Sequence, residues 1–131
     1  MRYKRPDSKN ALSIVEAAKR EMKYTLSIKL TEESGSTIIR NIYECFRMLG
    51  DSLLVKKGII SQDHLEPVRE LLKLQVSTPR PINLIDNLRI LRHNINYYGY
   101  NPKIEEVKDA LSFTESSFEI IYNQVLKNIN E

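Results

Sequence analysis

Residues 104–125 read IEEVKDALSFTESSFEIIYNQV and carry the strongest structural signal in the chain. Their apolar contact positions recur at alternating steps of three and four residues, which is the period of an amphipathic helix. These positions are Ile104, Val107, Leu111, Thr114, Phe118, Ile121 and Val125. Just before them, Asn101 is a good N-cap residue and Pro102 suits the first turn of a helix. The segment therefore predicts a long C-terminal helix with one buried face.

The same helical period recurs through the rest of the chain. Apolar stripes predict further helices over residues 8–30, 37–57, 64–74 and 82–98. Gly50 lies inside the second of these, where a glycine costs about 1 kcal/mol relative to alanine and marks a point where the helix can kink or break. Residues 1–6 are basic and without period, and are expected to fray. The short loops and the lack of strand-like alternation predict an all-α single domain over residues 1–131, a four- to five-helix up-and-down antiparallel bundle.

The composition is that of a soluble globular protein, with 41% hydrophobic and 28% charged residues in a chain of 131. No run of 18 apolar residues and no signal-type N-terminus is present, so we expect a cytoplasmic protein without a membrane segment. Cys45 is the only cysteine, which excludes an internal disulfide. It falls on a predicted core face, where a structural thiol is a better interpretation than a nucleophile.

The net charge of +3 is unevenly distributed along the chain. Residues 1–30 carry eight basic and three acidic side chains, residues 77–103 four and one, and residues 104–131 two and six. A chain segregated in this way can present a basic face to phosphate while its last helix stays acidic. Acidic and basic helices can equally complement each other, so charge alone is weak support for nucleic-acid binding.

The most polar helical segment is residues 87–101, NLRILRHNINYYGYN. On a helix, one arc carries the apolar side chains of Leu84, Leu88, Leu91, Ile95 and Tyr98. The neighbouring arc carries Arg89, Arg92, His93, Asn96 and Tyr100. Arg92 stands at the boundary between the arcs, where a partly desolvated guanidinium needs an anionic or carbonyl partner. The alternative is that Arg89 and Arg92 are solvated arginines whose stems cover the edge of the core.

Familiar catalytic and metal-binding motifs are absent from the sequence. It contains no glycine-rich phosphate loop, HExxH, paired CxxC or GxSxG. His64 and His93 are too few and too poorly spaced to indicate a metal site, and His64 is best interpreted as a solvated residue at a helix start. We therefore expect no metal and no cofactor. The arginine, histidine and tyrosine patch suits metal-free phosphate chemistry, and tyrosines beside arginines also suit unpaired bases.

The order of the segments resembles the HEPN superfamily of small helical bundles. The resemblance runs from about residue 12 onward and rests on LLVKKGI (residues 53–59), SQDH (residues 61–64), LRILRHNINYYGYNP (residues 88–102) and a long amphipathic terminal helix. It implies a four- or five-helix bundle that is commonly a homodimer. It also implies a small nucleotidyltransferase partner, in a pair of the toxin–antitoxin type.

The resemblance assigns roles to the polar segment. Catalytic members are metal-independent ribonucleases with an arginine, a following polar residue and a downstream histidine. Arg92 and His93 match the first two places, but the histidine place falls at Tyr97, Tyr98 or Gly99, and from Arg89 the spacing to His93 is too short. A tyrosine with a pKa near 10 is a poor general base. The segment RHNINYYGY is closer to a variant of the family motif in which a tyrosine follows the arginine after four intervening residues (Arg-x4-Tyr). In some toxin–antitoxin pairs of this family, the partner enzyme nucleotidylates a tyrosine near the motif. Tyr97, Tyr98 and Tyr100 match the position of that tyrosine.

Three functions are compatible with these residues. The first is an HEPN-like interaction module that binds a nucleotidyltransferase and presents a nucleotide- or RNA-facing cleft, with Arg89, Arg92, Asn96, Tyr98 and Tyr100 as binding residues. The second is an active endoribonuclease toxin, for which Arg92, His93 and Tyr97 are the catalytic candidates and Arg89 is an alternative to Arg92. The third is a structural bundle without a site. Whether the protein is an enzyme stays open at this level.

Overall fold

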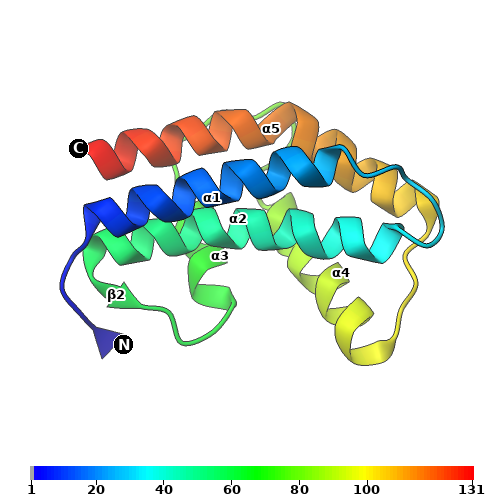
Figure 1. Cartoon of the computed structure of the whole chain (residues 1–131), viewed down its shortest axis with the longest axis horizontal. Coiled ribbons are helices and arrows are strands. Elements are labelled where there is room, and N and C mark those ends of the chain that lie inside the picture. The colour runs from blue at the N-terminus through cyan, green and yellow to red at the C-terminus, as the bar shows by residue number, and fades with distance from the viewer. Residues whose placement is uncertain (1) are drawn as a thin grey trace.

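A computed structural model describes residues 2–131 (Figure 1). These residues form the helices α1 (Ser8–Leu26), α2 (Gly35–Lys57), α3 (Leu65–Leu72), α4 (Leu84–Tyr98) and α5 (Ile104–Asn130). Two short strands, β1 (Arg2–Tyr3) and β2 (Ile59–Ile60), pair with each other in antiparallel orientation. The predicted all-α helical bundle is confirmed.

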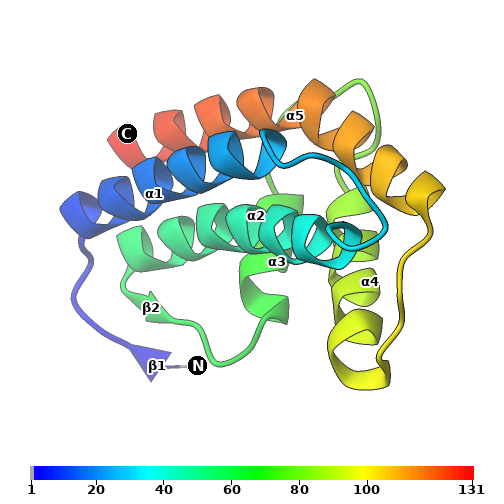
Figure 2. The same cartoon turned by 45° about the vertical axis from the view of Figure 1, so that its right-hand side comes forward.

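The three long helices form one body, and the two shorter ones lie on one side of it. Helices α1, α2 and α5 run side by side, with α1 opposite in direction to α2 and α5 (Figure 1). Helices α3 and α4 contact α2 and are steeply inclined to it (Figure 2). Because the chain returns through α3 and α4, α5 begins at the same end of the molecule as α2. Helix α2 is therefore the element against which the others are positioned.

The core is aromatic at its centre. The ring of Phe46 on α2 lies 5.7 Å from that of Phe113 and 5.5 Å from that of Phe118, both on α5, measured between centroids. The side chain of Cys45 is buried in the same core, and burial raises the pKa of its thiol to about 12. A thiol with that pKa is protonated at neutral pH, which agrees with a structural role.

Two helix starts and two helix ends follow capping residues in the sequence, whereas α5 begins at Ile104 with Lys103 as its N-cap, not at Pro102 after Asn101 as the sequence predicted. The carboxylate of Asp7 accepts a hydrogen bond from the backbone N–H of Asn10 at 2.9 Å and so caps α1. Asp63 does the same for α3, accepting from Leu65 N at 2.9 Å. Helices α2 and α4 end at Gly58 and Gly99, whose φ angles of 76° and 63° lie in the left-handed region that favours glycine.

Helix α2 continues unbroken through Gly50, where the sequence left a kink or break open. The glycine instead allows a close approach between helices. A Cβ atom at position 50 would lie 2.1 Å from the carbonyl oxygen of Pro67 on α3. The missing side chain thus lets the backbone of α3 rest directly on α2, which brings the start of α3 close to the polar side chains of α2.

The N-terminal arm does not fray over the residues that the structure describes. Besides the β1–β2 pair, the backbone N–H of Lys4 donates to Gly58 O at 2.7 Å and that of Asp7 to Val55 O at 3.2 Å. These bonds fix the arm to the end of α2. The expectation of a frayed arm was wrong for residues 2–6, because pairing with a distant segment supplied partners that the local sequence did not show; residue 1 lies outside the described part.

Candidate functional site

Helix α4 turns part of its polar surface toward α2. Arg89, Arg92 and Asn96 recur at spacings of three and four residues, which places them on neighbouring turns of one side of the helix. The guanidinium carbon of Arg92 lies 5.8 Å from the centre of the Tyr43 ring on α2. The side-chain oxygen of Asn96 accepts a hydrogen bond from Arg40 Nε at 2.7 Å. These contacts form a polar seam between α2 and α4, called the α2–α4 seam below.

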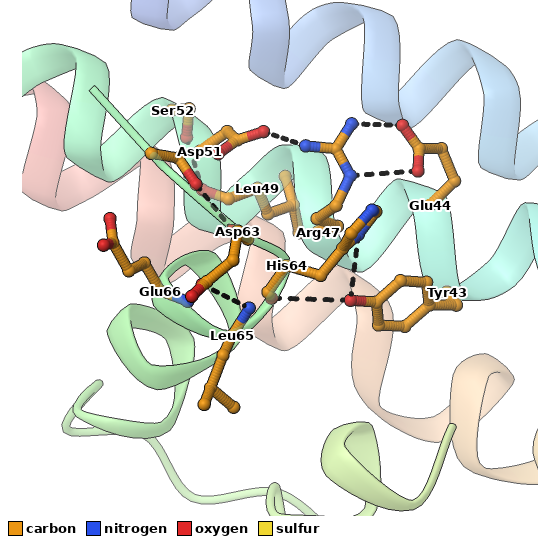
Figure 3. Close-up of polar contacts among 11 residues, drawn as sticks. Tyr43, Glu44, Arg47, Leu49, Asp51, Ser52, Asp63, His64, Leu65 and Glu66 are labelled. Atoms are coloured by element: carbon orange, nitrogen blue, oxygen red, sulfur yellow. Dashed lines mark hydrogen bonds and ion pairs between the residues drawn. The ribbon is translucent and has the colours of Figure 1, made fainter. Parts of the chain in front are cut away.

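The start of α3 brings a histidine to the same seam. The hydroxyl of Tyr43 lies 3.4 Å from Nδ1 of His64 and 3.5 Å from its backbone oxygen. Figure 3 shows the imidazole of His64 directed toward α2, next to Arg47. The rings of Tyr43 and His64 are 5.9 Å apart. His64 is exposed at the start of α3, as the sequence predicts, and its Nδ1 atom in addition lies within hydrogen-bond distance of the Tyr43 hydroxyl.

Arginines from both helices lie close enough to Tyr43 for their charges to act on it, but they differ in their counter-charges. Arg47 is paired with Glu44 and Asp51, as Figure 3 shows. Arg89 donates from Nε to Asp86 at 2.7 Å. Within residues 2–131, Arg92 has no carboxylate within ion-pair distance. Arg40 also lacks a carboxylate partner but is exposed, whereas Arg92 is half-buried, so Arg92 is the seam cation that is both partly desolvated and uncompensated among the described residues.

The environment of the α2–α4 seam shifts the pKa values of Tyr43 and His64. Burial raises the pKa of Tyr43 to about 12, although the charges of Arg92, Arg47 and Arg89 act in the opposite direction. The pKa of His64 is lowered, first by burial and then by the charges of Arg92 and Arg47. Tyr43 is therefore a hydrogen-bond donor without charge at neutral pH, and His64 is a neutral imidazole there.

A second group of side chains lies on a different side of α4. The ring of His93 is 4.6 Å from that of Tyr97 and 5.7 Å from that of Tyr98. Tyr97 is 67% exposed and Tyr98 is 75% exposed. We call His93, Tyr97 and Tyr98 the aromatic cluster. The structure thus divides the residues predicted from the sequence between two places: Arg89, Arg92 and Asn96 lie in the seam, whereas His93, Tyr97 and Tyr98 lie in the exposed cluster.

Tyr100 belongs to neither group. Its hydroxyl donates a hydrogen bond to the carboxylate of Glu106 in the first turn of α5, and that bond raises the pKa of the tyrosine. The same carboxylate accepts from the backbone N–H of Lys103 at 2.9 Å. Tyr100 therefore joins the loop after α4 to the start of α5, and its hydroxyl is occupied.

A groove of about 310 Å³ separates α4 from α5. Its walls are mainly apolar and include Leu88 and Leu91 on α4 and Phe113 on α5, with Asn87 and Asn94 at the polar edge. Ile90 also lines it and is 47% exposed. Sequence reasoning did not find this groove, because it depends on how far α4 stands from α5.

Sequence reasoning also missed Tyr43 and Arg47, and it set His64 aside. One local signal could have pointed to the first two. Tyr43 and Glu44 lie three and four residues after Arg40, and Arg47 lies four and three residues after them, so these four residues share one side of α2. That His64 and Arg92 meet this side could not be inferred, because neither lies near it in the sequence.

The remaining observations concern ligands, membranes and relatives. Among residues 2–131, no three His, Cys, Asp or Glu side chains converge in a way that could hold a metal ion. None of the helices described is long and apolar enough to cross a membrane. Comparisons of the chain with protein-family models, with curated proteins and with solved structures found no match. The assignment of a function therefore depends on the side chains of α2, α3 and α4.

Proposed function

We propose that this protein is an HEPN-like interaction module that binds RNA or a nucleotide through the exposed side of α4. The observation that carries the proposal is the aromatic cluster, whose rings gather on the last two turns of α4 immediately after Arg92. In this view the cluster contacts bases and the neighbouring arginines contact the phosphates. The partner is a small nucleotidyltransferase, as in pairs of the toxin–antitoxin type.

The exposure of the cluster supports base binding. Tyr97 and Tyr98 are among the most exposed large hydrophobic residues of the described chain, at 67% and 75%. Stacking of an unpaired base on such a ring contributes about 1–3 kcal/mol and depends little on the base. Segment 77–103 carries four basic and one acidic side chain, so its local charge also favours a polyanion.

The tyrosines differ in how well they would serve as sites of nucleotidylation. Transfer of a nucleotide to a phenol requires a hydroxyl that the partner enzyme can reach. Tyr97 and Tyr98 are exposed, whereas the hydroxyl of Tyr100 is hydrogen-bonded to Glu106. Within this proposal, Tyr97 and Tyr98 are therefore better acceptors than Tyr100.

We further propose that the protein is a homodimer that pairs through α4. A polar patch on a single helix forms a two-sided cleft only when two copies meet across a two-fold axis. The groove beside α4 supports this arrangement, since Ile90 stands partly exposed next to a hollow lined by Leu91 and Phe113. A protruding side chain beside an apolar hollow on the same face is self-complementary, as a two-fold interface requires.

An active, metal-independent ribonuclease is the second candidate. The observation that favours it is the neutral imidazole of His64 beside Arg92, because such a reaction needs a base and a cation that stabilises the phosphorane. His93 and Tyr97, which were the acid–base candidates from the sequence, lie instead in the aromatic cluster. A purely structural bundle is the least favoured reading, because it leaves both the exposed rings and the uncompensated Arg92 without a role.

Binding of a fluorescent single-stranded RNA, followed by anisotropy, tests the proposal. Replacement of both Tyr97 and Tyr98 by alanine should weaken binding by at least about tenfold. Tyr24→Ala is the matched control, because Tyr24 is a 64% exposed tyrosine on α1, and it should bind as the unmodified protein does. Absence of RNA binding, or an equal loss in the control, would contradict the proposal.

The same samples separate the two candidates. RNA is incubated with the protein in EDTA and analysed for cleavage. Cleavage that Arg92→Ala abolishes would favour the ribonuclease, and His64→Gln and His93→Ala then report which of the two histidines takes part. Binding without cleavage would favour the interaction module.

A further inference from the structure

The arginines near Tyr43 are not all paired with carboxylates. Arg47 already has two carboxylate partners, and Arg89 has one. Arg92, the third guanidinium near the phenol, is half-buried with its carbon 5.8 Å from the Tyr43 ring and has no such partner among residues 2–131. A partly desolvated guanidinium is stabilised by an anion that accepts its planar pair of N–H groups. The chain offers Arg92 an aromatic face in place of that anion.

His64 completes the local geometry. Its Nδ1 atom lies 3.4 Å from the hydroxyl of Tyr43. When the phenol donates to Nδ1, the proton of the neutral imidazole resides on Nε2. Nε2 is then a donor, and His64 and Arg92 both lie against the side chain of Tyr43. Because the Tyr43 side chain on α2 is fully buried in the core, its hydroxyl fixes the orientation of the His64 imidazole.

We propose that Arg92 and His64, oriented by Tyr43, bind a phosphate group where α2, α3 and α4 meet. This inference rests on the proposed function and deepens it, by naming the chemical group held by the seam and by adding His64 and Tyr43 to the site. Phosphate fits better than a carboxylate, because a tetrahedral anion presents oxygens to both a guanidinium fork and an imidazole N–H that approach from different helices. Tyr43 is a positioning residue, and Arg92 and His64 contact the anion.

The charged groups around His64 make phosphate binding measurable as a change in the pKa of this histidine. Arg47, Glu44 and Asp51 face it from α2, and Arg92 faces it from α4. The charge of Arg47 is countered by Glu44 and Asp51, whereas that of Arg92 is not. A phosphate bound to Arg92 cancels the repulsion that this arginine exerts on a protonated imidazole. Occupation of the site therefore raises the pKa of His64.

Proton NMR titration of the imidazole Cε1–H signals tests the proposal directly. The chain has only two histidines, His64 and His93, and His64→Gln and His93→Gln assign their signals. Inorganic phosphate should raise the pKa of His64 in a saturable manner and leave that of His93 unchanged, since His93 lies in the aromatic cluster. Arg92→Ala should raise the pKa of His64 without any ligand and abolish the further effect of phosphate.

Arg69→Ala provides the matched control. Arg69 is an exposed arginine on α3, so its removal changes the net charge by the same amount and should leave the phosphate response of His64 intact. Equal shifts of both histidines, or a shift that persists in Arg92→Ala, would mean that phosphate acts only through bulk electrostatics, and this would overturn the proposal. Tyr43→Phe should reduce the phosphate response; an unaltered response would remove Tyr43 from the site.

Two further ligands identify the source of the phosphate. Adenosine monophosphate and a short RNA without terminal phosphates are titrated in the same way. A response to inorganic phosphate and the mononucleotide alone assigns a terminal phosphate to the site, and a response to the RNA as well assigns a phosphodiester. No response of His64 to any of the three overturns the inference. RNA binding through the aromatic cluster can persist in that case, so the two proposals fail separately.

Discussion

The carbonyl oxygen of Pro67 lies so close to Gly50 that no side chain fits between α3 and α2 at this point. Alanine is the better helix former by about 1 kcal/mol, yet Gly50→Ala should destabilise the protein by about 1–3 kcal/mol, because its Cβ would force the helices apart. Urea denaturation measures the change. Ser13→Ala, at an exposed position of α1, should stay within about 0.5 kcal/mol of the unmodified protein. A Gly50→Ala protein as stable as the parent would refute the close approach.

A buried glutamate leads to a second prediction. The Glu70 side chain is 8% exposed and is paired with Lys57 at 2.8 Å and with Lys73 at 3.4 Å. Burial alone would raise the pKa of Glu70, but the hydrogen bond and charge of Lys57, with those of Lys73, lower it overall. Lys57→Met should raise this pKa and destabilise the protein by about 1–2 kcal/mol, a modest amount because Lys57 is itself half exposed.

The double variant Lys57→Met/Glu70→Gln distinguishes this cause from a general loss of charge. It should recover most of the stability, since the uncompensated buried carboxylate is gone. Lys23→Met on α1 serves as the control and should have little effect on the free energy of unfolding. An equal loss in Lys57→Met and in the double variant would show that the Lys57–Glu70 pair does not cause the change.

The lowered pKa of His64 predicts a pH dependence of stability. The unfolded chain has the ordinary histidine pKa of about 6.5 and binds a proton before the folded protein does. The contribution of His64 to the free energy of unfolding is therefore fully present above about pH 6.5 and decreases as the pH falls below that value. The free energy of unfolding should be lower at about pH 5.5 than at about pH 7.5, and His64→Gln should reduce this difference. If His93→Gln reduces it as much, the dependence does not come from the seam.

Self-association should depend on Ile90. If two copies pair through α4, a charge at the lip of the groove would be buried without a partner, so Ile90→Asp should yield a monomer by light scattering. Ile120→Asp is the matched control, because Ile120 is a 37% exposed isoleucine on α5 outside the groove. It should keep the mass of the parent. Circular dichroism of both variants separates dissociation from unfolding, and an unchanged mass for Ile90→Asp would place any dimer contact elsewhere.

The helices were predictable because their signal is local. The apolar period of α5, the caps at Asp7 and Asp63 and the stops at Gly58 and Gly99 each depend on neighbouring residues alone. The β1–β2 pair was not predictable, since two-residue strands are too short to show alternation and their partners are far apart in the sequence.

The site was predictable only in part, for a geometric reason. Arg92 and His93 are adjacent in the sequence, but a helix turns about 100° per residue, so adjacent side chains diverge. In the structure Arg92 meets Tyr43, and His93 meets Tyr97. The contact between Tyr43 and His64 depends on how α3 folds back onto α2, which a pattern along one helix does not contain.

The paired N-terminal arm has a practical consequence for experiments on this protein. The backbone N–H of Lys4 is hydrogen-bonded to the carbonyl oxygen of Gly58, and Gly58 lies at the start of the short connection that leads to His64. A bulky tag or a truncation at the N-terminus would disturb that connection and, through it, the imidazole. Recombinant material for titration of His64 should therefore keep residues 2–7 intact and carry any purification handle behind Glu131.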